Sequence, residues 1–205
     1  VILIIMSAIA AICALQLAGG LDYLVRIAEN ILRKNPKHIN YLAPTVTYFL
    51  TLLAGTGHTA FSMIPVIVEV AKSENIKPSV PLSIAVVASQ IGITASPVSA
   101  AVVAMSGFLE PYGVNYPTLL AICISTTFVA VMITAFIMST FANNDLSSDP
   151  VYQERLAAGH VAPPREKNTD FALKPGAKTS VLIFLIGIIC IVFYATAISK
   201  NIGLV

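Results

Sequence analysis

Apolar residues run through this chain in five long stretches that contain no Asp, Glu, Lys or Arg. The stretches cover residues 1–21, 38–68, 78–109, 111–144 and 179–199. A helix needs about 20 residues to cross the hydrocarbon core of a bilayer, and every stretch is long enough for that. The pattern therefore predicts an all-α, polytopic membrane protein.

Charged, Gly and Pro residues within and between these stretches divide the chain into seven predicted elements. They are, in order, a transmembrane helix at 1–18, a cytoplasmic interfacial amphipathic helix at 19–38, a re-entrant hairpin at 39–71, a discontinuous transmembrane helix at 78–109, a transmembrane helix at 118–141, a cytoplasmic loop at 142–178 and a transmembrane helix at 179–199.

The amphipathic helix at 19–38 is predicted from apolar residues at helical spacing. Leu21, Leu24 and Ile31 recur on one side, and charged residues such as Asp22 lie on the other faces. A helix of this type with a basic end is typical of a membrane interface. A helix packed on the rest of the protein has the same pattern, so both interpretations stay open.

The distribution of basic residues indicates that 39–71 enters and leaves the membrane on one side. This segment is too long for one upright helix and too short for two full spans. If it crossed once, the two sides of the membrane would hold 5 and 7 Lys and Arg residues, whereas a re-entrant hairpin gives 11 and 1. Short loops rich in Lys and Arg stay in the cytoplasm, so the hairpin is predicted to open there.

Labelling from the two sides of the membrane tests the hairpin topology. We expect cysteines placed at positions 35 and 75 to label from the same side, because these positions flank the hairpin. Labelling from opposite sides would mean that the segment crosses the membrane.

The cytoplasmic loop 142–178 is the one long hydrophilic connection. It is predicted to hold a short helix with Asp149 as its N-cap, Pro150 in its first turn and Gly159 just past its end. An alternative class of function is a sensor or regulatory partner, for which this loop would be the docking surface, although nothing in its sequence requires such a partner.

Composition narrows the class of protein. Hydrophobic residues make up 57% of the chain and charged residues 11%, against about 25% charged residues in a soluble protein. This excludes a water-soluble enzyme, a nucleic-acid-binding protein and a disordered tail. The three cysteines lie inside apolar segments and behave as small hydrophobic residues, so no metal site or other cofactor is expected.

Polar residues without charge interrupt two of the apolar stretches near their midpoints. The predicted substrate-binding residues are Gly55, Thr56, Gly57, His58 and Thr59 at the hairpin tip, and Gln90, Thr94, Ser96, Pro97 and Ser99 in the broken span. Pro97 lacks a backbone donor and disfavours helix at Ser96, which predicts the break. Half-helices that meet inside a membrane present N–H groups and positive dipole ends, so these segments are typical of an anion site.

Other interpretations of these residues stay open. Gly, Ser and Thr are also common packing residues between membrane helices. His58 either takes part in proton coupling or substrate binding, or is hydrogen bonded by Thr56 or the backbone. An intramembrane hydrolase that uses His58 is a different class of function, but the chain contains no Gly-x-Ser-x-Gly or His-Glu-x-x-His motif.

Several of these segments closely resemble one known family. Residues 19–22, 33–37, 55–59 and 95–103 are similar to the Dcu family of bacterial anaerobic C4-dicarboxylate transporters, and the loop helix at 149–159 resembles its A-type branch. The resemblance covers essentially the whole chain and matches the N-terminal half of such a transporter. The chain starts without Met inside an apolar run, so we expect an earlier element to precede it.

The resemblance implies a carrier of the bacterial inner membrane that exchanges or takes up fumarate, succinate, malate and aspartate. It also implies a fold of the ion-transporter superfamily, of which this chain holds one inverted repeat of two. In that superfamily a hairpin tip and a broken helix clamp the dicarboxylate together. This tip lacks the Asn of the superfamily pattern, so the coupling ion, H⁺ or Na⁺, stays open, as does assembly into a homo-oligomer.

Overall fold

The computed structural model describes residues 2–142, 145–159 and 174–193, and these residues form helices joined by short connections. The helices are α1 (Ile2–Leu17), α2 (Gly20–Lys34), η1 (Pro36–His38), α3 (Ile39–Ala54), α4 (Thr59–Ser73), α5 (Ser79–Ile93), α6 (Ala100–Leu109), η2 (Glu110–Tyr112), α7 (Tyr116–Phe141), α8 (Pro150–Ala157) and α9 (Ala177–Phe193). Within the described residues, contact of β type is limited to one isolated bridge between Ile76 and Asp145. The prediction of an all-α protein is confirmed.

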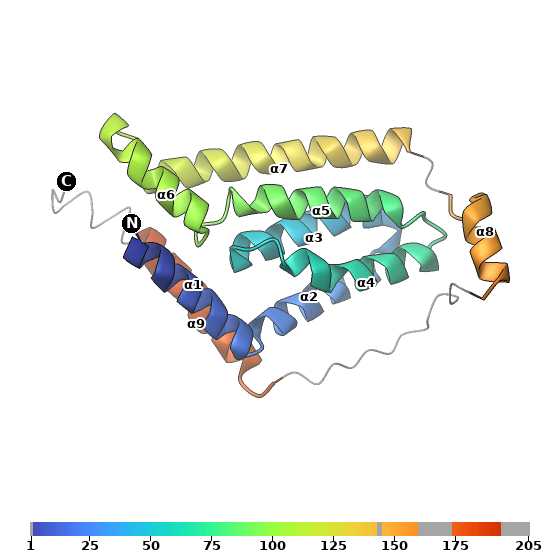
Figure 1. The fold of residues 1–205 in the computed structure, drawn as a ribbon, viewed down its shortest axis with the longest axis horizontal. Coiled ribbons are helices and arrows are strands. Elements are labelled where there is room, and N and C mark those ends of the chain that lie inside the picture. The colour runs from blue at the N-terminus through green and yellow to red at the C-terminus, as the bar shows by residue number, and fades with distance from the viewer. Residues whose placement is uncertain (1, 143–144, 160–173, 194–205) are drawn as a thin grey trace.

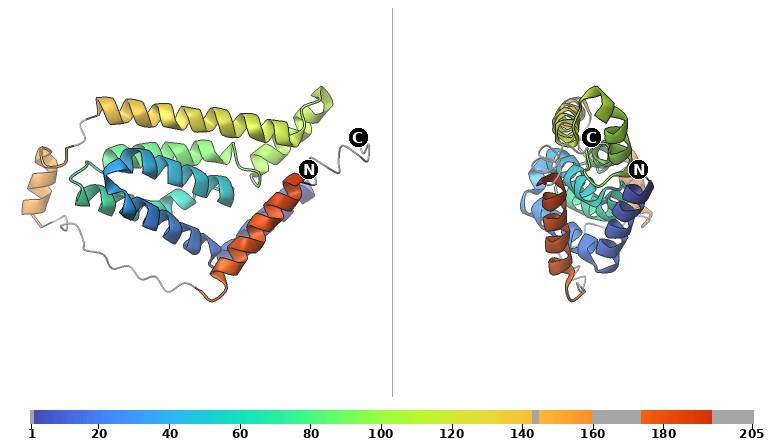
Figure 2. Two further views of the ribbon diagram at one scale, coloured as in Figure 1. Left: turned by 180° about the vertical axis from the view of Figure 1, so that it is seen from behind. Right: turned by 90° about the vertical axis from the view of Figure 1, so that its left-hand side faces the viewer.

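Helices α3, α4 and α5 lie side by side in the centre of the molecule, and α7 runs along the edge of this group, against α5 and α3 (Figure 1). Helices α1 and α9 incline away from them at one end, and α8 lies at the other end (Figures 1 and 2). The most extensive packing joins α3 to α5, and α5 in turn contacts α7. The two interrupted segments of the sequence are therefore neighbours in space.

The chain turns sharply between α1 and α2, where the two helix axes meet at 70°. Leu24, Ala28 and Leu32 form a buried stripe on α2 and belong to the main apolar core, together with residues of α3 and α4. Of the apolar residues on which the prediction rested, Leu24 is buried, whereas Ile31 is 39% exposed and its neighbour Leu32 is buried instead. Contact of its outer face with a membrane interface stays a prediction.

The segment 39–71 forms two antiparallel helices, α3 and α4, joined by a short tip at 55–58 (Figure 1). The inner arm, α3, comes close to α5 at Gly92. A Cβ atom at Gly92 would lie 3.1 Å from the backbone oxygen of Tyr48 and 3.3 Å from Cβ of Thr51. The absence of a side chain at Gly92 thus allows the close contact between the two helices.

The segment 78–109 consists of two helices at an angle to each other (Figure 1). Helix α5 ends at Ile93 and α6 begins at Ala100. Ser99, in an extended conformation, is the N-cap of α6, and its hydroxyl accepts a hydrogen bond from Ala101 N at 3.3 Å. The break therefore covers residues 94–99.

By length and apolar character, α7 is the one helix in the described part of the chain that is long enough to cross a bilayer alone. A second candidate exists if Ala10–Leu17 and Gly20–Lys34 are counted as one bent span. The sequence predicted four spanning segments. Helix α1, with 16 residues before its turn, and helix α5, with 15 residues before its break, are each shorter than the about 20 residues that a single upright span needs. The end of the last predicted span, beyond Phe193, lies outside the described residues.

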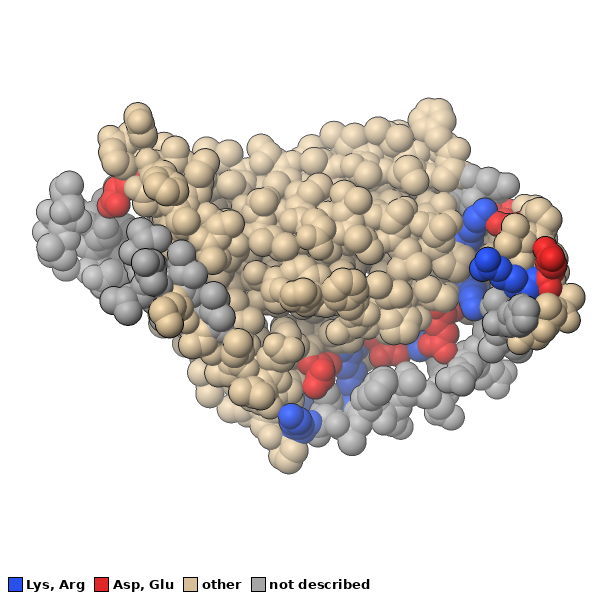
Figure 3. Space-filling model, in the orientation of Figure 1, with Lys and Arg blue, Asp and Glu red and all other residues tan. Residues whose placement is uncertain are grey.

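Charged side chains are unevenly distributed over the surface. Lys, Arg, Asp and Glu gather around α8 and along the edge near α2, and the broad face over the central helices shows none (Figure 3). Along α7, large apolar side chains such as Ile122, Val129 and Phe136 are more than half exposed. An apolar surface of this size is typical of contact with lipid or with another protein surface.

Hydrogen bonds and an ion pair join the segment after α7 to the turn between α4 and α5. The backbone nitrogen of Leu146 donates to the backbone oxygen of Asn75 at 3.0 Å, and Leu146 is buried. Asn75 Nδ2 donates to Asp145 Oδ1 at 2.9 Å. Lys77 Nζ lies 2.5 Å from Asp149 Oδ2. We call these five residues the loop clasp, because they join the loop to the hairpin and to α5.

Asp149 of the loop clasp also caps α8, accepting hydrogen bonds from Val151 N and Tyr152 N. The hydrogen bond to Lys77, followed by these backbone contacts, lowers the pKa of Asp149 below its usual value. We expect Asp149→Ala to increase amide hydrogen exchange in α8, and Glu154→Ala, on the exposed face of α8, to leave it unchanged. Equal exchange in the two variants would show that Asp149 does not hold α8.

The same lowered pKa predicts a pH dependence of α8. A carboxylate with a lower pKa in the folded state stabilises that state above its unfolded pKa of about 3.9, and this contribution is lost as the pH falls. Protection of α8 should therefore be constant near pH 7 and fall below about pH 4. Asp149→Ala should remove that change.

Candidate functional site

The hairpin tip contacts the break between α5 and α6 directly. Ser96 Oγ, which is buried, donates to the backbone oxygen of Leu52 at 2.6 Å and accepts from Val98 N at 3.3 Å. Gly55 ends α3 in the left-handed conformation, with φ of 68°. A Cβ atom on Gly55 would lie 2.8 Å from Cγ2 of Val98. The two interrupted segments therefore form a single site.

Hydroxyl groups hold the tip together. Thr51 and Thr59, on the two arms, are buried, and their hydroxyl oxygens lie 2.9 Å apart. Thr59 also donates to the backbone oxygen of Thr56 at 3.2 Å, and Thr56 Oγ1 accepts from the backbone nitrogen of His58 at 3.4 Å. The His58 side chain is exposed beside Phe61, with ring centroids 6.0 Å apart. Thr56 thus contacts the backbone of His58 and leaves its ring accessible.

Gln90 of α5 extends over Gly57 of the tip. A Cβ atom on Gly57 would lie 2.7 Å from Nε2 of Gln90, so the glycine leaves room for this side chain. Gln90 is exposed and Gly57 is buried. Thr94, one turn further along the chain, is also exposed, and its hydroxyl donates to the backbone oxygen of Ile91 at 2.7 Å. Gln90 and Thr94 therefore present polar atoms on the α5 side of the site.

Pro97 and Ser99 determine where α6 begins. The backbone oxygen of Pro97 accepts a hydrogen bond from the hydroxyl of Tyr116, at the start of α7. Ser99 is buried, and its hydroxyl caps α6. These contacts fix the start of α6 and join the break to the start of α7.

The electrostatics of the site are set by helix ends. Two helices, α4 and α6, begin here and two, α3 and α5, end here. The N-terminus of a helix carries a partial positive charge and the C-terminus a partial negative charge, so an anion would be stabilised at the starts of α4 and α6. The sequence places no Asp or Glu in 38–68 or 78–109, so no carboxylate from these segments offsets that charge. In the described ranges we find no group of three or more His, Cys, Asp or Glu residues that could hold a metal ion.

The ten predicted residues thus lie in the tip and in the broken helix, the two segments that meet here, but in different environments. Gly55, Gly57, Gln90 and Ser96 lie at the contact between the two segments. His58, Gln90 and Thr94 are exposed, Gly55, Thr56 and Pro97 are half-buried, and Gly57, Thr59, Ser96 and Ser99 are buried. The buried hydroxyl groups are hydrogen bonded within the protein, so the exposed group presents the accessible polar atoms. Substrate binding by any of the ten stays a prediction.

Sequence reasoning missed several residues that shape the site. Thr51 lies eight positions before Thr59, and this pair of hydroxyl residues across a Gly-rich tip is a signal that could have been recognised. The hydroxyl of Tyr48 hydrogen bonds to Thr127 of α7 at 2.8 Å, and Tyr116 bonds to a backbone oxygen of the break. Neither tyrosine contact has a signature in the sequence, because each joins segments far apart in the chain.

The comparison with protein families matches residues 1–204 to one family, described as anaerobic C4-dicarboxylate membrane transporters. The chain belongs to the DcuA–DcuB family. It is 71% identical over 205 residues to the C4-dicarboxylate transporter DcuA of Wolinella succinogenes and 52% identical over 205 residues to that of Escherichia coli K12. Each of these matches covers 100% of this chain and 47% of the relative.

The Escherichia coli O6:H1 anaerobic C4-dicarboxylate transporter DcuB is less similar, at 40% identity over 162 residues, which cover 77% of this chain and 36% of the relative. The predicted resemblance to the Dcu family and to its A-type branch is confirmed. No solved structure matches this chain.

The DcuA relatives are named as transporters of a membrane family that is not enzymatic, so the chain is part of a membrane protein and the alternative of an intramembrane hydrolase is excluded. The chain spans about half the length of the curated DcuA relatives that it matches.

Proposed function

We propose that the protein containing this chain transports C4-dicarboxylates across the bacterial inner membrane by alternating access, as a secondary active exchanger or uptake carrier. The proposed substrates are fumarate, succinate, malate and aspartate. One observation carries the proposal, namely the contact of the hairpin tip with the break between α5 and α6, in a chain of the C4-dicarboxylate transporter family.

A dicarboxylate suits the chemistry of this contact. Helix N-termini favour anions, and hydrogen bonds to a carboxylate are about twice as strong as those between neutral groups. In the proposed complex, one carboxylate is held from the tip by Thr56 and His58. The other is held from the α5 side by Gln90 and Thr94, whose polar atoms are exposed.

The buried residues of the site have a supporting role in this proposal. Ser96 keeps the tip and the break in contact, and Thr59 joins the two arms of the hairpin. Ser99 and Pro97 hold the start of α6, and Gly55 and Gly57 allow the close approach. The DcuA relatives are about twice as long as this chain. In the proposed mechanism their other half supplies the remaining partners of the substrate, as in transporters built from two repeats.

Counterflow in proteoliposomes that contain the full-length protein tests this function. Labelled succinate should accumulate in vesicles preloaded with fumarate and should not accumulate in vesicles preloaded with the monocarboxylate lactate. The same assay with and without a sodium gradient distinguishes Na⁺ from H⁺ coupling. Absence of counterflow with every C4-dicarboxylate would overturn the proposal.

A further inference from the structure

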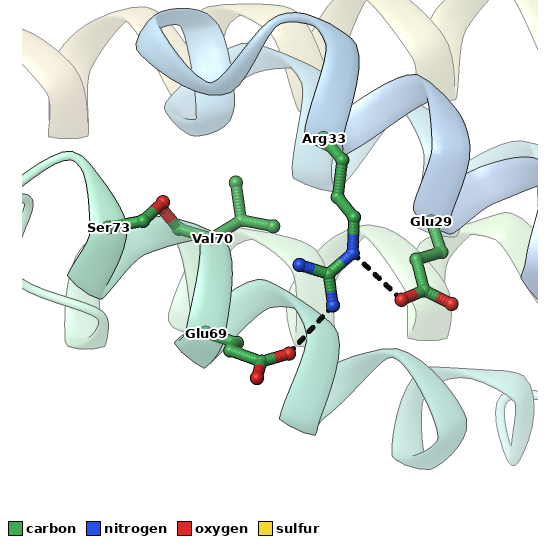
Figure 4. Close-up of polar contacts among 5 residues, drawn as sticks. All are labelled: Glu29, Arg33, Glu69, Val70 and Ser73. Atoms are coloured by element: carbon green, nitrogen blue, oxygen red, sulfur yellow. Dashed lines mark hydrogen bonds and ion pairs between the residues drawn. The ribbon is translucent and has the colours of Figure 1, made fainter. Parts of the chain in front are cut away.

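Arg33 joins two helices at the outer edge of the hairpin, away from the proposed substrate contacts. Its Nε lies 2.8 Å from Glu29 Oε1, one turn earlier on α2, and its Nη2 lies 2.7 Å from Glu69 Oε2 on α4 (Figure 4). One planar guanidinium thus binds carboxylates from two helices. A lysine has a single ammonium group and lacks this fork geometry.

These ion pairs are partly shielded from water. The exposed fractions of the side chains are 21% for Arg33, 14% for Glu29 and 27% for Glu69. Fully exposed pairs contribute little because solvent and salt screen them, whereas partly buried pairs are screened less. Salt should therefore weaken the ion pairs between α2 and α4 less than it weakens ion pairs on the open surface.

The ion pairs also lie next to the apolar contact between α2 and α4. Leu32 and Val70, the sequence neighbours of Arg33 and Glu69, are buried in the same core cluster. Apolar burial is non-directional and does not by itself select one register of two helices. Charge-assisted hydrogen bonds have a defined geometry, so Arg33 selects the register in which Glu69 lies opposite it.

The position of Glu69 bears on the tip because both belong to α4. Glu69 lies ten positions after Thr59 on α4, a rise of about 15 Å, so Arg33 has no contact with a ligand at the tip. Its influence on the site is exerted through the position of α4.

We propose that Arg33 is a positioning residue for transport. It clamps α4 to α2, so that the amphipathic helix and the outer arm of the hairpin move as one body during the transport cycle. The transport readout of this proposal rests on the proposed function, but the clamp itself is measured without any substrate.

The first test is transport by the full-length protein in proteoliposomes. Arg33→Gln and Glu69→Gln should each lower the maximal counterflow rate per folded molecule about tenfold, and KM should stay within about twofold, because the substrate contacts are intact. Lys34→Gln is the matched control, since Lys34 is the exposed basic neighbour of Arg33 on the same helix. This control should keep the wild-type rate.

The double substitution Arg33→Glu with Glu69→Arg exchanges the charges between the helices. It places the guanidinium on α4, opposite two carboxylates one turn apart on α2. We expect the rate to recover to within about threefold of wild type. If the two substitutions acted independently, their effects would add and the double variant would be slower than either single variant. Single variants at the wild-type rate, or a double variant no better than the singles, would overturn the clamp.

The second test is a distance between spin labels on α2 and α4, measured in lipid nanodiscs without substrate. Labels at Asn30→Cys and Ser73→Cys, both exposed positions, are introduced after replacement of the native cysteines, which in this chain are Cys13, Cys123 and Cys190. Glu69→Gln should broaden the distance distribution and Lys34→Gln should not. An unchanged distribution in Glu69→Gln overturns the clamp, whereas absence of wild-type counterflow overturns only the proposed function.

Discussion

Replacement of Gly55 by alanine is expected to lower dicarboxylate counterflow by at least about tenfold. Gly55 has a φ of 68°, a conformation that costs about 1 kcal/mol for alanine. The added Cβ would also lie 2.8 Å from Val98 Cγ2 and 3.1 Å from Ile12 Cδ1. To relieve these contacts, the Val98 and Ile12 side chains must move or the tip and the break must separate, and either change alters the geometry of the site.

Gly113→Ala separates the two causes of this effect. Gly113 has a similar φ of 78°, but a Cβ atom there meets nothing within 4 Å. Both variants should therefore lose about 1 kcal/mol of stability from backbone strain, seen as a lower Tm, and only Gly55→Ala should lose transport. Equal initial rates of counterflow in the two variants would show that the contact of Gly55 with Val98 has no role in transport.

Ser96→Ala is expected to reduce counterflow about tenfold, because it removes the hydrogen bond that joins the break to the hairpin. In the variant, the backbone oxygen of Leu52 and the backbone nitrogen of Val98 lose this buried partner. A buried polar group without a partner costs about 1–3 kcal/mol, and relief of that cost requires the segments to move apart. Initial rates over a range of fumarate concentrations measure the loss.

Ser83→Ala is the matched control for Ser96→Ala. Ser83 lies on α5 and also donates to a backbone oxygen, but that oxygen belongs to Val80 in the same helical turn. Its removal should leave the counterflow rate unchanged. Wild-type uptake in both Ser96→Ala and Thr56→Ala would remove these two residues from the site.

Much of the local structure could be predicted from the residues themselves. Gly55 and Gly57 interrupt one apolar stretch, Pro97 interrupts another, and the chain leaves the helix at both places. Glycine and proline act on the backbone of their own neighbourhood, so their effect is visible in a single segment. The end of α2 before Pro36 follows from the same local reasoning.

The contacts between segments could not be predicted in this way. Ser96 and Thr94 are both hydroxyl residues in an irregular segment, yet one is buried against Leu52 and the other is exposed. No periodicity exists in such a segment to distinguish the two. The pair of Arg33 with Glu69 joins residues 36 positions apart, and its formation depends on how α2 packs on α4.

The close approach of α3 and α5 at Gly92 has a mechanical consequence. The backbone of α3 lies against α5 at this point, so movement of the hairpin away from the broken helix would lose this close contact. In the proposed cycle, access to the substrate therefore changes by movement of the hairpin and α5 together, against other parts of the transporter. The bound dicarboxylate would then travel with its binding site, and the tip would not open as a separate gate.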